Sequence, residues 1–259
     1  TMMSFDDLVL DDRSVQAMIT ENSYCGRGLG IGRNDKGHYV FVYFLTGRST
    51  DSQNRGFVEK GGPNGIVRTA QVKKKKIPKK KRRLIIYTAL AVKQVGDRRF
   101  AFATNGAQTE TLLRLMKKET GFLGILGRWN HEPDQPNNTA RISGMISFGE
   151  DGRSTPSATL SMIKCDPVLQ VASRASWPVN LNLDGGHMVT TYREDGKPLP
   201  PFEGLPFPIQ LHGNARQIGQ YFWSALPEKT KVSLVVRTFK RNGEVVSTFI
   251  KNGRGEPKG

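Results

Sequence analysis

The stretch that decides the fold is YCGRGLGIGRNDKGHYVFVYFLTGRSTDSQNRGF, residues 24–57. Leu29–Gly32 and Tyr39–Leu45 are apolar or small, and turn-forming residues lie between them at Asn34–Gly37, so the stretch predicts two short paired strands. Arginines stand where strands meet loops, at Arg27, Arg48 and Arg55. Planar guanidinium groups beside glycines and hydroxyl groups are typical of a site for a phosphorylated small molecule. A hairpin with solvated arginines is the simpler interpretation of this stretch taken alone.

Length and composition set the class of protein. A chain of 259 residues can bury roughly three quarters of its unfolded surface. No apolar run approaches the roughly 18 residues of a membrane span, and no signal-peptide pattern opens the sequence. The two cysteines, Cys25 and Cys165, are too few for a disulfide framework and fit a reducing compartment. We therefore expect a cytoplasmic protein with no membrane association.

The histidines give no indication of a metal site. They are scattered, without metal-ligand spacing to one another or to the cysteines, at His38, His131, His187 and His212. We expect neither a structural metal nor a cofactor.

Much of the net charge of +16 lies in one block. Nine of the eleven residues from Lys73 to Arg83 are basic, and such a block repels itself and usually lies in solvent. We predict a basic surface loop over residues 73–83, with nonspecific affinity for polyanions through counterion release. A dedicated nucleic-acid site is the less favoured interpretation, because the block contains no aromatic residue and no helix-turn-helix or zinc-finger spacing accompanies it.

The rest of the chain predicts many strands and few helices. Helical periodicity marks residues 4–22, 108–118 and 214–225. Further strands are expected at residues 84–92, 99–104, 141–148, 157–164, 168–173, 188–192, 231–239 and 245–250. The proline-rich residues 199–208 exclude a helix, and residues 253–259 resemble a frayed tail. This order predicts one α+β domain over residues 1–259, with an N-terminal helix (residues 1–23), two mostly antiparallel sheets and helices packed outside them.

Seven segments together resemble the stand-alone IMP cyclohydrolase family of archaeal and bacterial type. They are YCGRGLGIGR, GRSTDSQNR, LIIYTAL, TNGAQTETL, EPDQPNNTARISG, GHMVTTYREDGKPLPPFEG and VSLVVRTF. Each is short, but their order from about Tyr24 to Ile250 is far more specific than any one of them. The resemblance implies a four-layer αββα sandwich like that of the N-terminal-nucleophile hydrolases. It implies no N-terminal nucleophile for this reaction, so we expect no role for Thr1.

The family's reaction closes 5-formamidoimidazole-4-carboxamide ribotide (FAICAR) to IMP with loss of water, in purine biosynthesis. The resemblance thus implies a hydrolase that binds a purine ribonucleotide and needs no cofactor or metal. The carboxamide nitrogen must attack a formamide carbon of the same molecule, so the substrate has to be held folded. One positioned acid or base, a hydroxyl group and a cationic or amide cradle would suffice for the chemistry.

The resemblance also assigns the residues of the site. Glu132 is expected to transfer protons, Tyr87 to contact the formyl or carboxamide group, and Arg55 to orient the substrate or stabilise charge. The expected substrate-binding residues are Arg27 and Arg48, on the 5′-phosphate and ribose side, with Ser49, Asn105, Gly106, Thr109, Asn138 and Arg141.

Each assignment has a structural alternative. Without the motif, Glu132 is an exposed loop carboxylate, Tyr87 a core residue at the end of an apolar strand, and Arg141 an ion-pair partner. Cys25 is more simply a small buried residue than a nucleophile. The sequence departs from the family pattern at Ala107, Asn138 and Ala140, and its basic block is longer and more charged than the segment usual there.

Other functions stay open on the sequence. A nucleic-acid or nucleotide-binding protein could reuse the scaffold, with residues 73–83 as its contact surface. An amide hydrolase of the N-terminal-nucleophile class would need a processed serine, threonine or cysteine terminus. The oligomeric state is open as well, and exposed sheet edges would favour a homo-oligomer.

Overall fold

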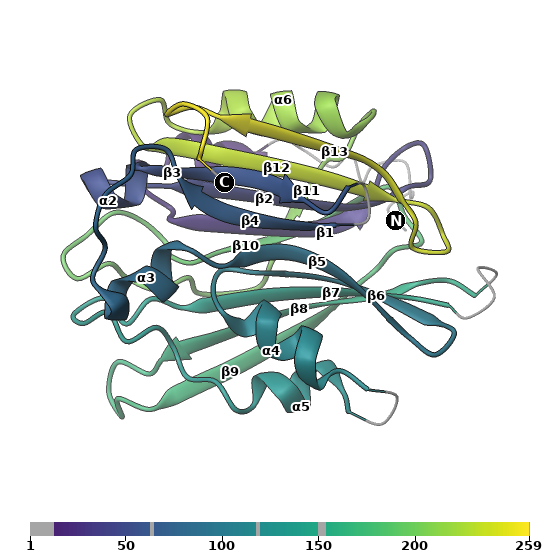
Figure 1. The fold of residues 1–259 in the computed structure, drawn as a ribbon, viewed down its shortest axis with the longest axis horizontal. Coiled ribbons are helices and arrows are strands. Elements are labelled where there is room, and N and C mark those ends of the chain that lie inside the picture. The colour runs from purple at the N-terminus through teal and green to yellow at the C-terminus, as the bar shows by residue number, and fades with distance from the viewer. Residues whose placement is uncertain (1–12, 63–64, 118–119, 150–153, 259) are drawn as a thin grey trace, which may run out of the picture.

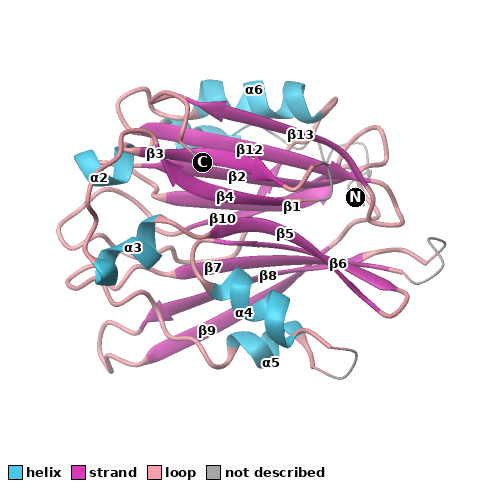
Figure 2. Cartoon of the chain, in the orientation of Figure 1, coloured by secondary structure: helices cyan, strands magenta, loops and turns pink. Residues whose placement is uncertain are grey.

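The computed structural model describes residues 13–62, 65–117, 120–149 and 154–258, and its strands form two antiparallel sheets (Figure 1). Residues 4–12 of the predicted N-terminal helix lie outside the described residues. Its last part is helical, as α1 (Arg13–Val15) followed by a π-helical turn (Gln16–Thr20). Figure 2 shows how far strands outweigh helices, which confirms the predicted α+β class with two sheets.

One sheet has six strands and carries the hairpin that opens the sequence analysis. Its order is β11 (Phe207–Ile209), β10 (Gly185–Thr190), β1 (Arg27–Arg33), β2 (Tyr39–Thr46), β12 (Lys231–Phe239) and β13 (Val245–Asn252). The predicted turn between β1 and β2 forms because Asn34 Oδ1 accepts hydrogen bonds from the backbone N–H of Lys36 and His38. Gly37 completes it with a φ of +75°, which glycine adopts without steric cost.

The other sheet has seven strands. Its order is β3 (Arg55–Lys60), β4 (Ile66–Gln71), β5 (Thr88–Val95), β6 (Arg98–Thr104), β7 (Arg141–Phe148), β8 (Ser157–Cys165) and β9 (Ala172–Val179). The two sheets pack face to face around one apolar core that draws on both of them. They approach so closely at Gly144 that a Cβ atom there would lie 2.7 Å from Ile31 Cδ1 of the opposite sheet.

The longer helices lie on the outer faces of the sheets (Figure 1). Helix α6 (Ala215–Ala225) begins at a capping box made by Asn214 and covers β12 and β13. Helices α4 (Gln108–Leu115) and α5 (Phe122–Leu126) pack on the seven-stranded sheet through a separate apolar cluster that includes Phe102. Two short helices, α2 (Thr50–Gln53) and α3 (Lys79–Ile85), lie together on one side of the molecule.

Polar side chains also join the two sheets. Arg237 of β12 is fully buried, and its guanidinium donates to Glu59 Oε1 of β3 at 2.5 Å and to the carbonyl oxygen of Gly65 at 2.7 Å. Asn252 of β13 forms hydrogen bonds with both backbone groups of Phe57, which lies in β3. These contacts fasten the edge strand β3 to the six-stranded sheet.

Three local predictions were wrong. Residues 84–92 do not form one strand: Leu84 and Ile85 end helix α3, and β5 begins at Thr88. Residues 79–83 of the basic block are therefore helical rather than loop, since lysine, arginine and leucine are good helix formers. The strand predicted at 168–173 begins only at Ala172, because Asp166 caps a turn by accepting from the backbone N–H groups of two residues that follow it.

The chain end differs from its prediction too, and three strands were missed, β3, β4 and β11. The backbone N–H of Gly253 donates to the carbonyl oxygen of Val232 in β12 at 2.9 Å, and that of Lys258 to the carbonyl oxygen of Gln71 in β4 at 2.8 Å, so this segment is held at two points rather than frayed. Strands β3 and β4 were not predicted. Both are short and contain charged residues, so neither has a clear period-two pattern.

The ion pair between the sheets yields a stability prediction. Glu59→Ala leaves the buried Arg237 guanidinium without its carboxylate, so we expect it to lower the free energy of unfolding by about 2–4 kcal/mol. Glu203→Ala is the matched control, because Glu203 pairs with Arg193 in solvent, where an ion pair contributes less than about 1 kcal/mol. Urea unfolding of both variants measures the difference. If both variants lost the same free energy of unfolding, the buried pair would stabilise the protein no more than the exposed one does.

Candidate active site

A cavity of about 750 Å³ opens where β1 and β3 begin, so that both sheets contribute to its wall. It is lined by Tyr24, Gly26, Arg27, Arg48, Ser49, Asp51, Ser52, Arg55, Leu84, Ile85, Glu132, Pro133, Asp134, Gln135, Asn137, Tyr192 and Leu199. Its volume is within the range usual for small-molecule sites.

A buried ion pair forms the inner wall of the cavity. Glu132 is 1% exposed, and its two carboxylate oxygens accept from the Arg27 guanidinium at 2.5 and 3.1 Å. Arg27 also donates to the carbonyl oxygen of Asn105 at 2.9 Å. Burial acts to lower the pKa of Arg27, but the Glu132 carboxylate together with Tyr87 and Tyr43 holds that pKa well above its usual value. This bidentate contact fixes the carboxylate in one orientation.

Arg141 supports the same carboxylate from behind. Its Nη1 lies 3.9 Å from Glu132 Oε1 and donates to Gln108 at 3.0 Å, and its guanidinium lies over the ring of Trp129. Burial lowers the pKa of Arg141, and the neighbouring Glu132 opposes that effect. The buried carboxylate therefore has two cations beside it, which compensates the loss of water around it.

Two tyrosines lie next to this ion pair. The hydroxyl groups of Tyr43 on β2 and Tyr87 before β5 are 2.7 Å apart, and both side chains are buried. Burial, followed by the neighbouring Tyr87, raises the pKa of Tyr43 well above its usual value. The Tyr87 phenol is close enough to Arg27 to interact with it electrostatically. The two hydroxyl groups form a hydrogen-bonded pair beside the charged wall.

A second hydroxyl chain borders the cavity on its other side. The hydroxyl of Thr139 contacts both the Asp134 carboxylate and the Tyr192 hydroxyl, and its backbone N–H donates to Asp134 at 2.7 Å. The rings of Tyr192 and Tyr24 stack with their centroids 5.8 Å apart. The Arg48 guanidinium lies over the Tyr24 ring, 4.8 Å from its centroid. These contacts give the cavity an aromatic side.

The three arginines of the cavity differ in what holds them. Arg27 is bound to Glu132, and Arg48 is paired with Asp195. Arg55 is 4% exposed, and its Nε donates to the carbonyl oxygen of Ser52 at 3.1 Å. Within the described part of the chain, no carboxylate pairs with Arg55 and its Nη atoms make no hydrogen bond. This guanidinium is therefore able to bind an anion in the cavity.

The predicted site residues fall into three groups. Five line the cavity together, namely Arg27, Arg48, Ser49, Arg55 and Glu132. Five others lie behind its wall, namely Tyr87, Asn105, Gly106, Thr109 and Arg141. Asn138 does neither: with a φ of +46° it directs its amide to the sulfur of Cys165.

Several cavity residues were not found from the sequence. The main ones are Tyr24, Asp51, Asp134 and Tyr192. Tyr24 and Asp134 lie inside quoted motifs, next to predicted site residues, and that adjacency was the available signal. Nothing local links Tyr192 to Thr139, because 53 residues separate them along the chain.

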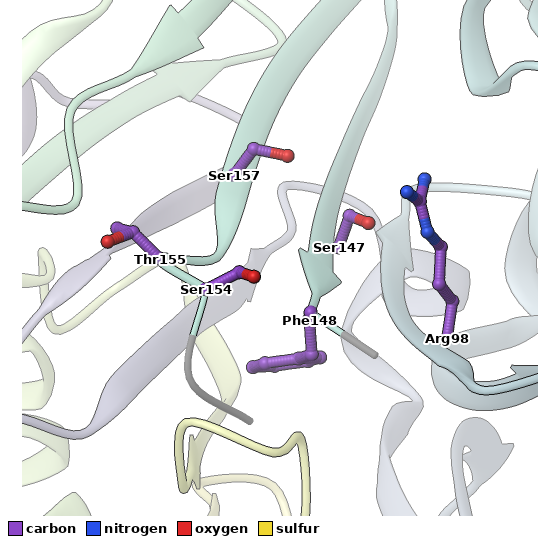
Figure 3. A pocket seen from close by; sticks show the side chains of 7 residues that line it. Arg98, Ser147, Phe148, Ser154, Thr155 and Ser157 are labelled. Carbon is purple, nitrogen blue, oxygen red and sulfur yellow. The ribbon is translucent and has the colours of Figure 1, made fainter. Parts of the chain in front are cut away.

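A smaller cavity of about 400 Å³ lies at the far end of β7 from Arg141. Because β7 has eight residues, the two ends of this strand are about 25 Å apart. Figure 3 shows the hydroxyl groups of this smaller cavity, from Ser147, Ser154, Thr155 and Ser157, with Arg98 beside them. None of the predicted site residues lines it.

Two other features bear on the chemistry. In the described residues, no three histidine, cysteine or acidic side chains are grouped so that they could hold a metal ion. Cys25 is buried, and burial raises the pKa of its thiol to about 12, so the thiolate that a nucleophile needs is disfavoured.

Comparison with known families identifies the chain. A family model described as IMP cyclohydrolase-like protein matches residues 24–244, which is most of the sequence. The chain belongs to the IMP cyclohydrolase-like family. This confirms the resemblance seen in the motifs and supports a cyclohydrolase-type enzyme of purine metabolism. No curated protein and no solved structure matched the chain. No helix among the described residues is long and apolar enough to span a membrane.

The buried ion pair of this cyclohydrolase-like protein yields a second stability prediction. Arg27→Met removes the bidentate partner of Glu132, so we expect the free energy of unfolding to fall by about 3 kcal/mol. The double variant Arg27→Met/Glu132→Leu removes both charges and should recover most of that loss. Chemical unfolding of the single and double variants measures the coupling.

The matched control is Arg48→Met. Arg48 lines the same cavity, but its partner Asp195 is partly exposed, so its loss should lower the free energy of unfolding by less than about 1 kcal/mol. If the double variant were as unstable as the sum of its single variants, the pair would not be the compensated unit described above.

Proposed function

We propose that this protein closes FAICAR to IMP with loss of water. The observation that carries the proposal is the oriented, buried Glu132 carboxylate in a nucleotide-sized cavity that also holds the unpaired Arg55 guanidinium. Family membership supplies the reaction type.

The contacts of the arginines suggest how the substrate lies. Arg55 is the guanidinium able to accept an anion, and the hydroxyls of Ser49 and Ser52 lie on the same side of the cavity. We assign the 5′-phosphate to this side. The reacting imidazole groups then lie toward Glu132 and the tyrosine pair. Arg27 positions the Glu132 carboxylate in this arrangement and does not bind phosphate.

The chemistry needs proton movement at three atoms. The carboxamide nitrogen forms a bond to the formyl carbon and loses one proton to Glu132, while the formyl oxygen gains charge and takes up a proton to become a hydroxyl group. The formamido nitrogen then loses its own proton and forms a double bond to the same carbon, and the hydroxyl group takes up this second proton and leaves as water when its bond to that carbon breaks. Tyr87, held by Tyr43 behind the cavity wall and next to Arg27, would help that guanidinium to stabilise the developing charge on the substrate oxygen. Holding both reacting groups in one cavity supplies the effective concentration that an intramolecular closure exploits.

Two wider features complete the proposal. Helices on the outer faces of two stacked sheets support a four-layer αββα sandwich of the N-terminal-nucleophile-hydrolase type. Both cysteines are free, which supports a cytoplasmic location. Homo-oligomer formation stays a prediction.

Conversion of FAICAR to IMP, followed by ultraviolet absorbance and by the mass of the product, tests the proposal. We expect the wild-type protein to form IMP, Glu132→Gln to lower kcat/KM by about 100-fold or more, and Tyr87→Phe by about tenfold. The reasons are the loss of the proton acceptor and of one hydroxyl contact.

Controls of the same residue types lie at the other end of the strands. Glu244→Gln, in the turn after β12, and Tyr39→Phe, at the start of β2, should stay within about twofold of wild type. Absence of IMP with the wild-type protein would contradict the proposed function. IMP formation at wild-type rates by the Glu132 and Tyr87 variants would contradict the residue assignments instead.

A further inference from the structure

The basic segment, residues 73–83, is the feature that the proposed reaction leaves unexplained. No acidic residue occurs in the sequence between Glu59 and Asp97, so nothing within the segment's own stretch of chain offsets its nine positive charges. Lys73–Lys76 are exposed. A nucleoside monophosphate carries only about two negative charges, and Arg55 with the hydroxyl groups of Ser49 and Ser52 could bind its phosphate without the basic segment.

The segment is fastened along the rim of the cavity. Asn54 precedes Arg55, and its side chain donates to the carbonyl oxygen of Lys73 at 2.8 Å and accepts from the Lys73 backbone N–H at 2.7 Å. The Lys75 ammonium donates to Asp51 Oδ1 at 2.6 Å, and Asp51 lines the cavity. Figure 1 shows α2 and α3 on the same side of the molecule, as these contacts require. The lysines therefore stand beside the mouth, next to the anion-binding arginine.

The two residues that follow the segment line the cavity itself. These residues are Leu84 and Ile85, at the end of α3. The Thr69 hydroxyl holds this end of the helix by donating to the carbonyl oxygen of Ile85 at 2.7 Å. The exposed Lys73–Lys76 therefore lie in a stretch that is held to the rim at Asn54 and Asp51 and leads into the cavity wall. Of the four exposed lysines, Lys75 forms an ion pair with Asp51, whereas Lys73, Lys74 and Lys76 form none with the described residues.

We propose that the cavity and the basic segment together bind purine nucleoside triphosphates, with the first phosphate at Arg55 and the outer phosphates on Lys73, Lys74 and Lys76. The inference rests on the proposed function for the nucleoside end of the cavity. The bound triphosphate occupies the substrate's place, so it inhibits ring closure competitively. A single-stranded nucleic acid is the less favoured ligand, because residues 73–83 contain no aromatic side chain on which bases could stack.

Calorimetric titration with IMP and with inosine triphosphate, in the presence of EDTA, tests the inference. We expect the triphosphate to bind the wild-type protein at least tenfold more tightly than IMP. In Lys73→Ala/Lys74→Ala/Lys76→Ala this advantage should fall below threefold, while the affinity for IMP and the turnover of FAICAR stay within about threefold of wild type. Raising the salt concentration should reduce the affinity for the triphosphate more than that for IMP.

The matched control is Lys36→Ala/Lys240→Ala/Arg241→Ala, which removes three exposed cations from turns at the other end of the six-stranded sheet. It should keep the full preference for the triphosphate. Equal binding of the two nucleotides by the wild-type protein, or a preference that survives in the Lys73–Lys76 variant, would overturn the inference and leave the proposed reaction standing. Failure to turn over FAICAR is the separate result that overturns the proposed reaction.

A dephosphorylated ten-nucleotide RNA is the third ligand. We expect it to bind at least tenfold more weakly than the triphosphate and not to displace IMP. If it bound as tightly as the triphosphate and lost that affinity in the Lys73–Lys76 variant, the segment would be a nucleic-acid surface and the inference would be wrong.

Discussion

A carboxylate can be buried in a protein only when a cation compensates the water it loses, and the region around Glu132 is built on that constraint. Arg27 comes from β1 of the six-stranded sheet, whereas Arg141 begins β7 of the seven-stranded sheet. Both guanidinium groups meet the same carboxylate. The compensation therefore joins the two sheets at the point where the cavity opens, and the packing of the sheets and the orientation of the carboxylate depend on each other.

The same constraint separates arginines that look alike in the sequence. Arg27 and Arg48 have carboxylate partners, so their charges already serve the protein's own structure. Arg55 lines the cavity too, but its Nε donates to the backbone carbonyl of Ser52 and, within the described part of the chain, no carboxylate pairs with it. The role of each arginine is thus decided by the neighbours that the fold brings to it. This is also why a phosphate is better placed at Arg55 than at Arg27.

The parts of the fold that local chemistry determines could be predicted from the sequence. The turn at Asn34–Gly37 closes through its own side chain, and β12 has the bounds that its apolar run predicted. The helix α3 was missed because an apolar run after the basic block suits either a strand or the end of a helix. The preceding lysines and arginines are good helix formers, so Leu84 and Ile85 continue their helix instead of starting a strand.

The site could be predicted only as a set of residues, not as an arrangement. Arg55 and Glu132, which the motifs selected, line the same cavity, and their roles there stay a prediction. They could not show that Glu132 is bound to Arg27, or that Tyr43 holds Tyr87, because these pairs form between segments distant in the chain. Asn138 is a motif residue that does not line the cavity, because its left-handed backbone conformation directs its amide to Cys165.

A crystal structure of the protein with IMP bound tests the central claim most directly. The account predicts the phosphate within hydrogen-bond distance of the Arg55 guanidinium and the purine ring beside the Glu132 carboxylate, with the Arg27–Glu132 pair intact. A nucleotide bound outside this cavity, or a phosphate that displaces Glu132 from Arg27, would contradict it.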